Sequence, residues 1–119
     1  MHPVISEHLN EIHTLCKQHR VDKLWLIGSA LDEHKFTPTS DIDFLLTYDD
    51  GGAYNPDYDY VAHWSNLLTA LRNLPKREVQ LIEYGELRNL YFRTSVEATK
   101  KLIYDKNTEN LNFSFSISR

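Results

Sequence analysis

Two aspartates, Asp41 and Asp43, stand one residue apart at the start of the apolar run "DIDFLLTY". Side chains at positions i and i+2 of a strand leave the same face, with Cα atoms about 6.5 Å apart. At this range and an effective dielectric of 20, two carboxylates repel each other by about 2–3 kcal/mol. A divalent cation reverses the sign of that energy, and Mg²⁺ favours one or two carboxylates together with substrate phosphates. The pair therefore predicts a metal site that works with a phosphate-bearing ligand.

A Gly-Ser pair, Gly28 and Ser29, closes the preceding apolar run "KLWLI". Glycine lets phosphate oxygens approach the backbone, and the following N–H groups and the Ser29 hydroxyl can donate hydrogen bonds to them. Alone, Gly-Ser is usually a turn, and Asp-x-Asp is more often structural than catalytic. The combination is more specific: a strand, Gly-Ser, a spacer containing "TPTS", and Asp-Ile-Asp opening a second strand. It predicts a triphosphate cradle beside a metal clamp.

The rest of the chain supplies elements that would position these residues. Helical spacing of Ile5, Leu9, Ile12 and Cys16 predicts an amphipathic helix over residues 4–19, which makes Cys16 a core residue. In "DIDFLLTY", alternation turns Ile42, Phe44 and Leu46 to one side and Asp41, Asp43 and Leu45 to the other. Further strands are predicted at "KLWLIG" and "EVQLIEY", and further helices at residues 60–71 and at about 89–104.

This order predicts one domain of the α/β (α+β) class, with helices packed on a small sheet. The domain is expected to span residues 1–105. A tail, residues 106–119, contains the alternating "NFSFSIS". The tail is expected to add an edge strand, to pair with a second copy in a homodimer, or to have no fixed structure.

Composition excludes several classes of function. A net charge of −4 disfavours non-specific binding of nucleic acid, which depends on many basic contacts to phosphates. The six histidines form no metal-binding spacing, and the single cysteine excludes an internal disulfide, as expected in a reducing cytoplasm. The chain has no signal peptide at its start and no apolar run near the roughly 18 residues that span a bilayer.

The segment "LIGSALDEHKFTPTSDIDFLLTY" resembles the signature of the minimal nucleotidyltransferases, small members of the DNA polymerase β-like superfamily. The resemblance extends to the opening "LCKQHRVDKLWLIGSA" and the closing "VQLIEYGELRNLYFRTSVEATKKLIYD". It implies a polymerase β-like fold, in which Gly28 and Ser29 hold nucleotide phosphates. Asp41 and Asp43 would then be catalytic and bind Mg²⁺ or Mn²⁺. The implied reaction transfers a nucleoside monophosphate from a nucleoside triphosphate, ATP being expected, to an acceptor hydroxyl. Relatives of this size often work with a HEPN-type partner protein as toxin–antitoxin pairs.

The chain departs from that family pattern at Gln80, which stands where active members carry a third carboxylate. Neither neighbour is expected to replace it: Glu78 lies about 6.6 Å back along the strand, and Glu83 faces the other side. The spacer after Ser29 is also one residue longer than usual and lacks the common Arg-Gly. Two readings follow: an active nucleotidyltransferase, or a catalytically degenerate fold that binds a nucleotide or a protein. A third, an antibiotic-type nucleotidyltransferase, lacks the usual acceptor domain.

Two further groups carry open interpretations. Tyr48, Tyr54, Tyr58 and Tyr60 lie in or beside the loop 48–60, where they would stack a base, contact a partner, or pack locally to anchor the loop. The basic residues Arg72, Lys76 and Arg77 would contact phosphate or form a solvated helix end.

Overall fold

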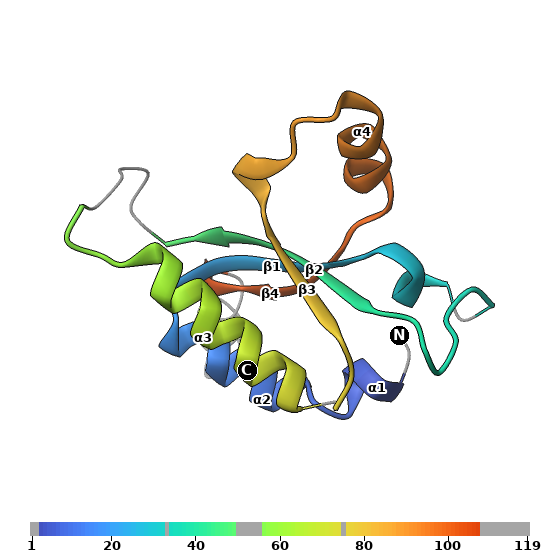
Figure 1. The fold of residues 1–119 in the computed structure, drawn as a ribbon, viewed down its shortest axis with the longest axis horizontal. Coiled ribbons are helices and arrows are strands. Elements are labelled where there is room, and N and C mark those ends of the chain that lie inside the picture. The colour runs from blue at the N-terminus through green and yellow to red at the C-terminus, as the bar shows by residue number, and fades with distance from the viewer. Residues whose placement is uncertain (1–2, 33, 50–55, 75, 108–119) are drawn as a thin grey trace, which may run out of the picture.

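The structure, a computed structural model, describes residues 3–32, 34–49, 56–74 and 76–107. Four α-helices, two 3₁₀ helices and four strands are formed by these residues (Figure 1). In chain order they are α1 (Pro3–Ser6), α2 (Leu9–Gln18), β1 (Val21–Ile27), η1 (Gly28–Leu31), β2 (Ile42–Tyr48), α3 (Tyr60–Asn73), β3 (Val79–Glu83), η2 (Tyr84–Glu86), α4 (Leu90–Thr99) and β4 (Lys101–Asp105).

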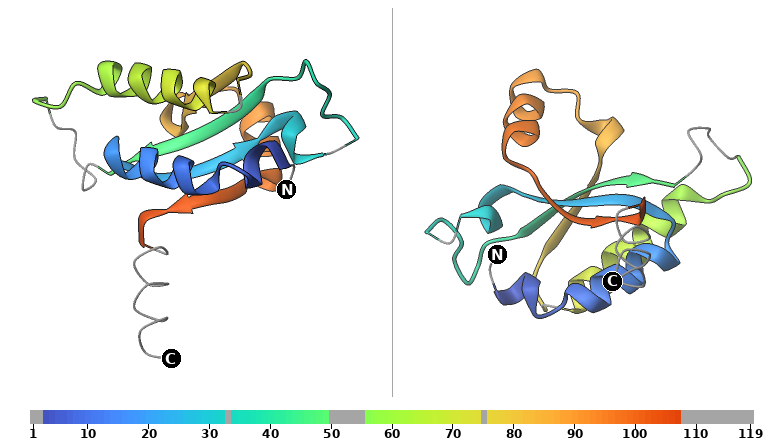
Figure 2. Two further views of the ribbon diagram at one scale, coloured as in Figure 1. Left: turned by 90° about the horizontal axis from the view of Figure 1, so that it is seen from below. Right: turned by 180° about the vertical axis from the view of Figure 1, so that it is seen from behind.

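The strands form one mixed sheet in the order β3-β2-β1-β4. Strand β1 pairs with β2 and β4 in antiparallel fashion, whereas β2 and β3 are parallel and are joined through α3. Helices α2 and α3 lie side by side on one face of the sheet, and α4 stands on the other (Figures 1 and 2). The predicted α/β (α+β) class with a small mixed sheet is confirmed.

The alternation predicted for "DIDFLLTY" decides which face of the sheet each side chain meets. Ile42, Phe44 and Leu46 are buried in the main core beneath α1, α2 and α3, which also holds the fully buried Cys16. Leu45 points to the opposite face. A second, smaller cluster there joins Ile27, Leu45, Leu87 and Val96 beneath α4. Because both faces of β2 are buried, its register is fixed, and a slip by one residue would bury the aspartates.

The last predicted helix, residues 89–104, is wrong after Thr99. Helix α4 ends at Thr99, Lys100 takes an extended backbone conformation (φ −55°, ψ 142°), and residues 101–105 form the edge strand β4. Leu102 and Tyr104 pair with β1 instead of continuing a helical stripe. Backbone pairing along the open edge of β1 outweighs the weak helical periodicity here.

The predicted helix over residues 4–19 is also corrected, because it is two helices. His8 leaves helical geometry (φ −114°, ψ 12°) between α1 and α2. Ile5 and Ile12 are nevertheless both buried in the main core, so the predicted apolar face is retained across the break.

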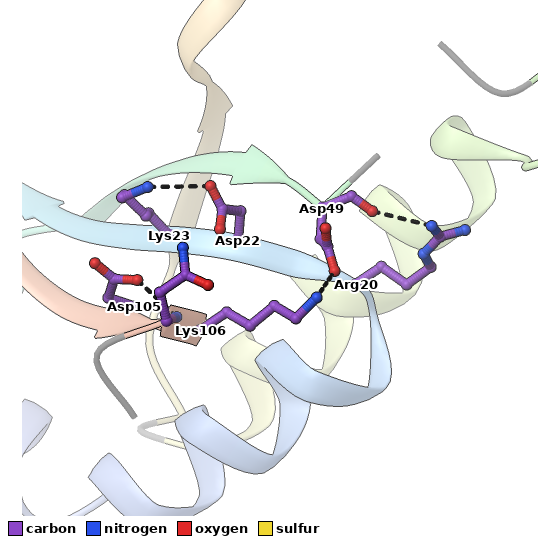
Figure 3. A network of polar contacts seen from close by, with 7 residues as sticks. Arg20, Asp22, Lys23, Asp49, Asp105 and Lys106 are labelled. Carbon is purple, nitrogen blue, oxygen red and sulfur yellow. Dashed lines mark hydrogen bonds and ion pairs between the residues drawn. The ribbon is translucent and has the colours of Figure 1, made fainter. Parts of the chain in front are cut away.

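A polar network fastens the end of the sheet away from Gly28 (Figure 3). An ion pair joins Lys106, just after β4, to Asp49, just after β2. Arg20 donates to the Asp49 carbonyl oxygen at 3.0 Å. The start of β1 and the ends of β2 and β4 are thus held together by contacts that do not involve the predicted site.

Two further sequence-based expectations concern membrane spans and the C-terminal tail. Among the described helices, none combines the length and apolar character needed to cross a membrane. The alternating part of the tail lies outside the described residues, and the sheet edge next to β1 is taken by β4.

Candidate functional site

Gly28 lies where β1 ends and η1 begins, and its backbone adopts a left-handed conformation with φ +76°. A Cβ atom placed on Gly28 would lie 2.5 Å from Oδ2 of Asp43, closer than such atoms approach each other in proteins. The Asp43 carboxylate therefore packs directly on the Gly28 backbone. Both the dihedral angle and the contact require glycine at this position.

Ser29 follows in η1, whose first residues remain accessible while Ala30 is buried in the main core. Burial of Ala30 anchors the turn, and the amide of Asp32 donates to the Ser29 carbonyl oxygen at 3.1 Å. The Gly28–Ser29 segment is thus held with its backbone at the surface, beside Asp43. Exposed amides in such a turn are the groups that bind phosphate oxygens.

Asp41 and Asp43 flank Ile42, which is completely buried in the main core. The two carboxylates consequently lie on the other face of the sheet, the face on which α4 stands. Burial raises the pKa of the Asp43 carboxyl above its ordinary value, and the nearby Asp41 charge raises it further. A bound cation would relieve the repulsion that the Asp43 carboxylate experiences.

Gln80 on β3 is paired with Asp43 in the parallel register of β2 and β3. Its side-chain Nε2 donates to Oδ2 of Asp41 at 3.4 Å, a long hydrogen bond. The structure therefore brings Asp41, Asp43 and Gln80 together from two neighbouring strands, next to Gly28. Gln80 thus places an amide at the position where the pattern of active family members has a third carboxylate.

No other carboxylate reaches this position among the parts of the chain that the structure describes. Glu78 forms an ion pair with Arg72, and the charge of Glu83 acts on Tyr48 at the far end of β3. The same described residues contain no group of three His, Cys, Asp or Glu side chains that could hold a metal ion. A cation at this site would have two protein carboxylates, with neutral oxygens or phosphates completing its shell.

Arg77 is the residue near the site whose placement the sequence did not reveal. It lies beyond α3, where its guanidinium donates to the carbonyl oxygens of Thr37 and, at 3.0 Å, of Ser40. It also covers the Phe36 ring, 4.3 Å from its centroid. Arg77 thus clamps the turn that leads directly into Asp41. Because these partners are about forty positions away in the chain, no local spacing could have indicated the contact.

The described tyrosines of the loop region pack against one another. The rings of Tyr48 and Tyr60 meet edge to face at 5.2 Å, and those of Tyr58 and Tyr60 at 4.7 Å. The Tyr58 hydroxyl donates to the carbonyl oxygen of His19 at 3.1 Å. Burial, followed by the charge of Glu83, raises the pKa of Tyr48. The rings of Tyr48, Tyr58 and Tyr60 thus pack locally against one another. Tyr54 lies outside the described residues.

A hollow of about 740 Å³ lies beside these tyrosines. Tyr48, Asp57, Glu83 and Gly85 are among the residues that line it. None of Gly28, Ser29, Asp41 and Asp43 does. This hollow is therefore not part of the candidate site, which lies at the start of β2.

Comparisons with known proteins agree on the class of fold. A chain from a toxin–antitoxin crystal structure with AMP-PNP has a TM-score of 0.62 at 18% identity, covering 91% of this chain and 82% of that chain. A protein assigned as a minimal nucleotidyltransferase has a TM-score of 0.63 at 18% identity, covering 82% and 90%. A Shewanella oneidensis complex of a tri-AMPylated HEPN toxin with an MNT antitoxin gives 0.58 at 16% identity, covering 93% and 81%.

At these identities the structural likeness establishes the fold alone, which is that of a polymerase β-like nucleotidyltransferase. The family model described as "Polymerase beta, Nucleotidyltransferase" matches residues 10–109, most of the chain. The chain therefore belongs to the polymerase β nucleotidyltransferase family, and its neighbours in structure are minimal nucleotidyltransferases. A search of curated proteins found no match.

Proposed function

We propose that this protein binds a nucleoside triphosphate with Mg²⁺ and transfers its nucleoside monophosphate to a hydroxyl group. The observation that carries the proposal is the contact between the Asp43 carboxylate and the Gly28 backbone, with Asp41 alongside. The contact supports the proposal because the exposed Gly28 turn lies beside two neighbouring carboxylates. Such a pair of features suits a polyphosphate and a cation together, and neither alone.

The residues fit a divalent metal. Two carboxylates two positions apart at the start of β2 offer oxygen ligands of the kind that Mg²⁺ or Mn²⁺ accepts, and the Gln80 amide, whose Nε2 contacts Asp41, could add its oxygen after turning over. When bound, such a metal neutralises phosphate charge and aligns the phosphates. Gly28 and Ser29 would hold the β- and γ-phosphates through backbone amides and the Ser29 hydroxyl, leaving the α-phosphorus facing the aspartates.

In the proposed transfer, the acceptor oxygen forms a bond to the α-phosphorus. The bond from that phosphorus to the α–β bridging oxygen breaks, and pyrophosphate leaves. The hydroxyl proton must be lost to solvent, because the Gln80 amide cannot accept it. We therefore expect transfer to be slower than in a protein with a carboxylate at this position.

The proposed acceptor is a hydroxyl on a HEPN-type partner protein, and the proposed donor is ATP. Support comes from the resemblance of the signature segment and from the structural neighbours, one with AMP-PNP and one containing a tri-AMPylated HEPN toxin.

The test uses purified protein, Mg²⁺, ATP and a purified HEPN-type protein from the same organism, followed by intact-mass measurement. We expect additions of one adenylate mass to the partner and equimolar pyrophosphate, both abolished by EDTA. Asp43→Asn should remove the product, while Asp22→Asn, whose carboxylate contacts Lys23 at the other end of β1, should not. Absence of adduct and pyrophosphate with every divalent metal tried would exclude the transfer reaction.

One observation favours a second function, a non-catalytic binding module. The Gln80 amide donates a hydrogen bond to the Asp41 carboxylate. A carboxylate in place of Gln80 would instead add the negative charge that a second cation needs. Such a protein would bind its partner or a nucleotide without chemistry.

Substitution Gln80→Asp separates these two functions. An inert wild type whose Gln80→Asp variant transfers adenylate would identify a binder that has lost the reaction. A wild type that transfers, with a variant that transfers faster, would instead support the enzyme. The same mass measurement scores both proteins, with Gln80→Ala as the matched control that adds no charge.

A further inference from the structure

Helix α4 is much less buried than a helix of this size normally is. Of its ten residues only Val96 is buried. Leu90 is 72% exposed and Tyr91 is 88% exposed. A ten-residue helix is marginal by itself, so most of its stability should come from packing of an apolar face. Most apolar side chains of α4 are instead exposed to solvent.

Polar contacts hold one side of α4 to the rest of the protein. The Asn89 side chain caps the helix by accepting from the Phe92 amide at 3.0 Å. Arg93 and Glu97 pair at 3.1 Å, and Glu97 also accepts from the Tyr84 hydroxyl at 2.8 Å. These contacts fix the orientation of α4 without covering its outer side. The helix is therefore presented in a defined position.

The outer α4 surface comprises Leu90, Tyr91, Thr94 and Ala98, all exposed. At 100° per residue these four positions lie next to one another, and Tyr91, Thr94 and Ala98 lie roughly opposite Val96. The surface has no charged residue, a large aromatic ring at one end and small residues at the other. That composition resembles the centre of a protein interface, where tyrosine is enriched and charge is depleted.

The surroundings of this surface are basic in an acidic protein. Residues 88–101 contain Arg88, Arg93, Lys100 and Lys101 but a single acidic residue, Glu97, giving a formal charge of +3 in a chain of −4. A two-fold pairing of α4 with α4 of a second copy would bring these like charges together. The charge distribution instead suits a different protein with acidic residues around an apolar groove.

The position of α4 connects this surface to the candidate site. Val96 packs with Ile27 and Leu45, and Ile27 is the residue of β1 that pairs with Asp43. Helix α4 thus stands over the face of the sheet that carries Asp41, Asp43 and Gln80 (Figure 1). A protein bound to the outer α4 surface would lie on the same side of the sheet as the candidate site.

We propose that the outer α4 surface is the docking site for the acceptor protein, which presents an apolar groove rimmed by acidic residues. This inference rests on the proposed function for the identity of the partner as the acceptor. Tyr91 and Leu90 enter the groove, and Arg88 and Lys101 meet its rim. Docking there keeps the acceptor on the side of the sheet that carries the candidate site.

The experiment uses calorimetry to measure binding of a purified HEPN-type protein from the same organism. The double substitution Leu90→Ser with Tyr91→Ser should weaken binding about tenfold or more, as expected for buried aromatic anchors. The matched control is Val61→Ser, which alters an apolar side chain of α3 that is 77% exposed on the other face. It should change affinity by less than about twofold. Lys101→Glu should weaken binding, and the effect should shrink at high salt.

Separate titration of Mg²⁺–ATP into the same variants distinguishes this inference from the proposed function. Unchanged nucleotide binding with lost partner binding supports α4 as the docking surface. Partner binding equal to wild type in the double variant overturns it, whatever the nucleotide titration shows. Failure of wild type to bind the partner also overturns it. A wild type that is dimeric by light scattering, with a monomeric double variant, would assign the surface to a second copy and overturn it as well. If wild type does not bind Mg²⁺–ATP, that result contradicts the proposed function instead.

Discussion

At the scale of residues, Gly28 and Asp43 form the most constrained contact of the candidate site. Gly28 combines φ +76° with a carboxylate oxygen where a Cβ atom would lie. Any side chain must therefore move Asp43 or the turn. Because these are the groups proposed to bind cation and phosphate, a structural change here and a change in ligand binding should be inseparable.

We predict that Gly28→Ala lowers the free energy of unfolding by about 1–3 kcal/mol, the range for strained backbone conformations. It should also weaken binding of Mg²⁺–ATP. Gly85→Ala is the control, because a Cβ atom there would meet its nearest neighbour, Oε1 of Glu83, only at 3.9 Å. Urea denaturation and calorimetry measure both effects. Equal behaviour of the two variants would contradict the geometry described for Gly28.

The sequence located these residues because their signal is local. Gly-Ser at a strand end and two aspartates at the start of another can be recognised within 16 positions, from Gly28 to Asp43. Gln80 was expected beside them from the family resemblance, and its register with Asp43 agrees. The sequence could not show the hydrogen bond from Gln80 to Asp41, since side-chain contacts across strands depend on the folded register.

At the scale of elements, the turn before β2 depends on a residue from a distant segment. Thr37 and Ser40 bond to each other through their hydroxyl groups at 2.9 Å, and Arg77 binds their carbonyl oxygens from the start of the β3 segment. The Ile42 amide donates to the Glu78 carbonyl oxygen at 3.0 Å. Arg77 is therefore a positioning residue for Asp41.

We predict that Arg77→Ala weakens Mg²⁺–ATP binding about tenfold, whereas ATP binding in EDTA changes little. The difference is expected because Arg77 acts through the carboxylate and not through the nucleotide. Arg72→Ala is the matched control, since its exposed ion pair with Glu78 should contribute little. Equal losses with and without Mg²⁺ would instead indicate direct phosphate contact or general loosening.

Elements were predicted well where the apolar residues follow one clear period and poorly where they fit two. The alternation in β2 and the helical stripe of α3, with Leu67, Leu68 and Leu71 buried, both reflect contact with the main core. Residues 101–105 were misassigned as helix because three consecutive apolar residues fit either period. Their conformation is decided by the free edge of β1, which is a property of the assembled sheet.

At the scale of the whole molecule, the two faces of the sheet have different tasks. One face is closed by α1, α2 and α3 and holds most of the buried apolar side chains. The other carries the candidate site, a small apolar cluster and the exposed helix α4. We infer that stability resides mainly in the first face. The second face is left open for ligands, which agrees with the proposed transfer to a protein acceptor.

The central claim is that Asp41 and Asp43, beside Gly28 and Ser29, bind a metal–nucleotide complex. Calorimetric titration of Mg²⁺–ATP into wild type, Asp43→Asn and Asp22→Asn tests it most directly. We predict one binding site in wild type and in Asp22→Asn, and at least a tenfold loss of affinity in Asp43→Asn, corresponding to about 1.4 kcal/mol. Undetectable binding by wild type, or equal affinity in all three proteins, would contradict the claim.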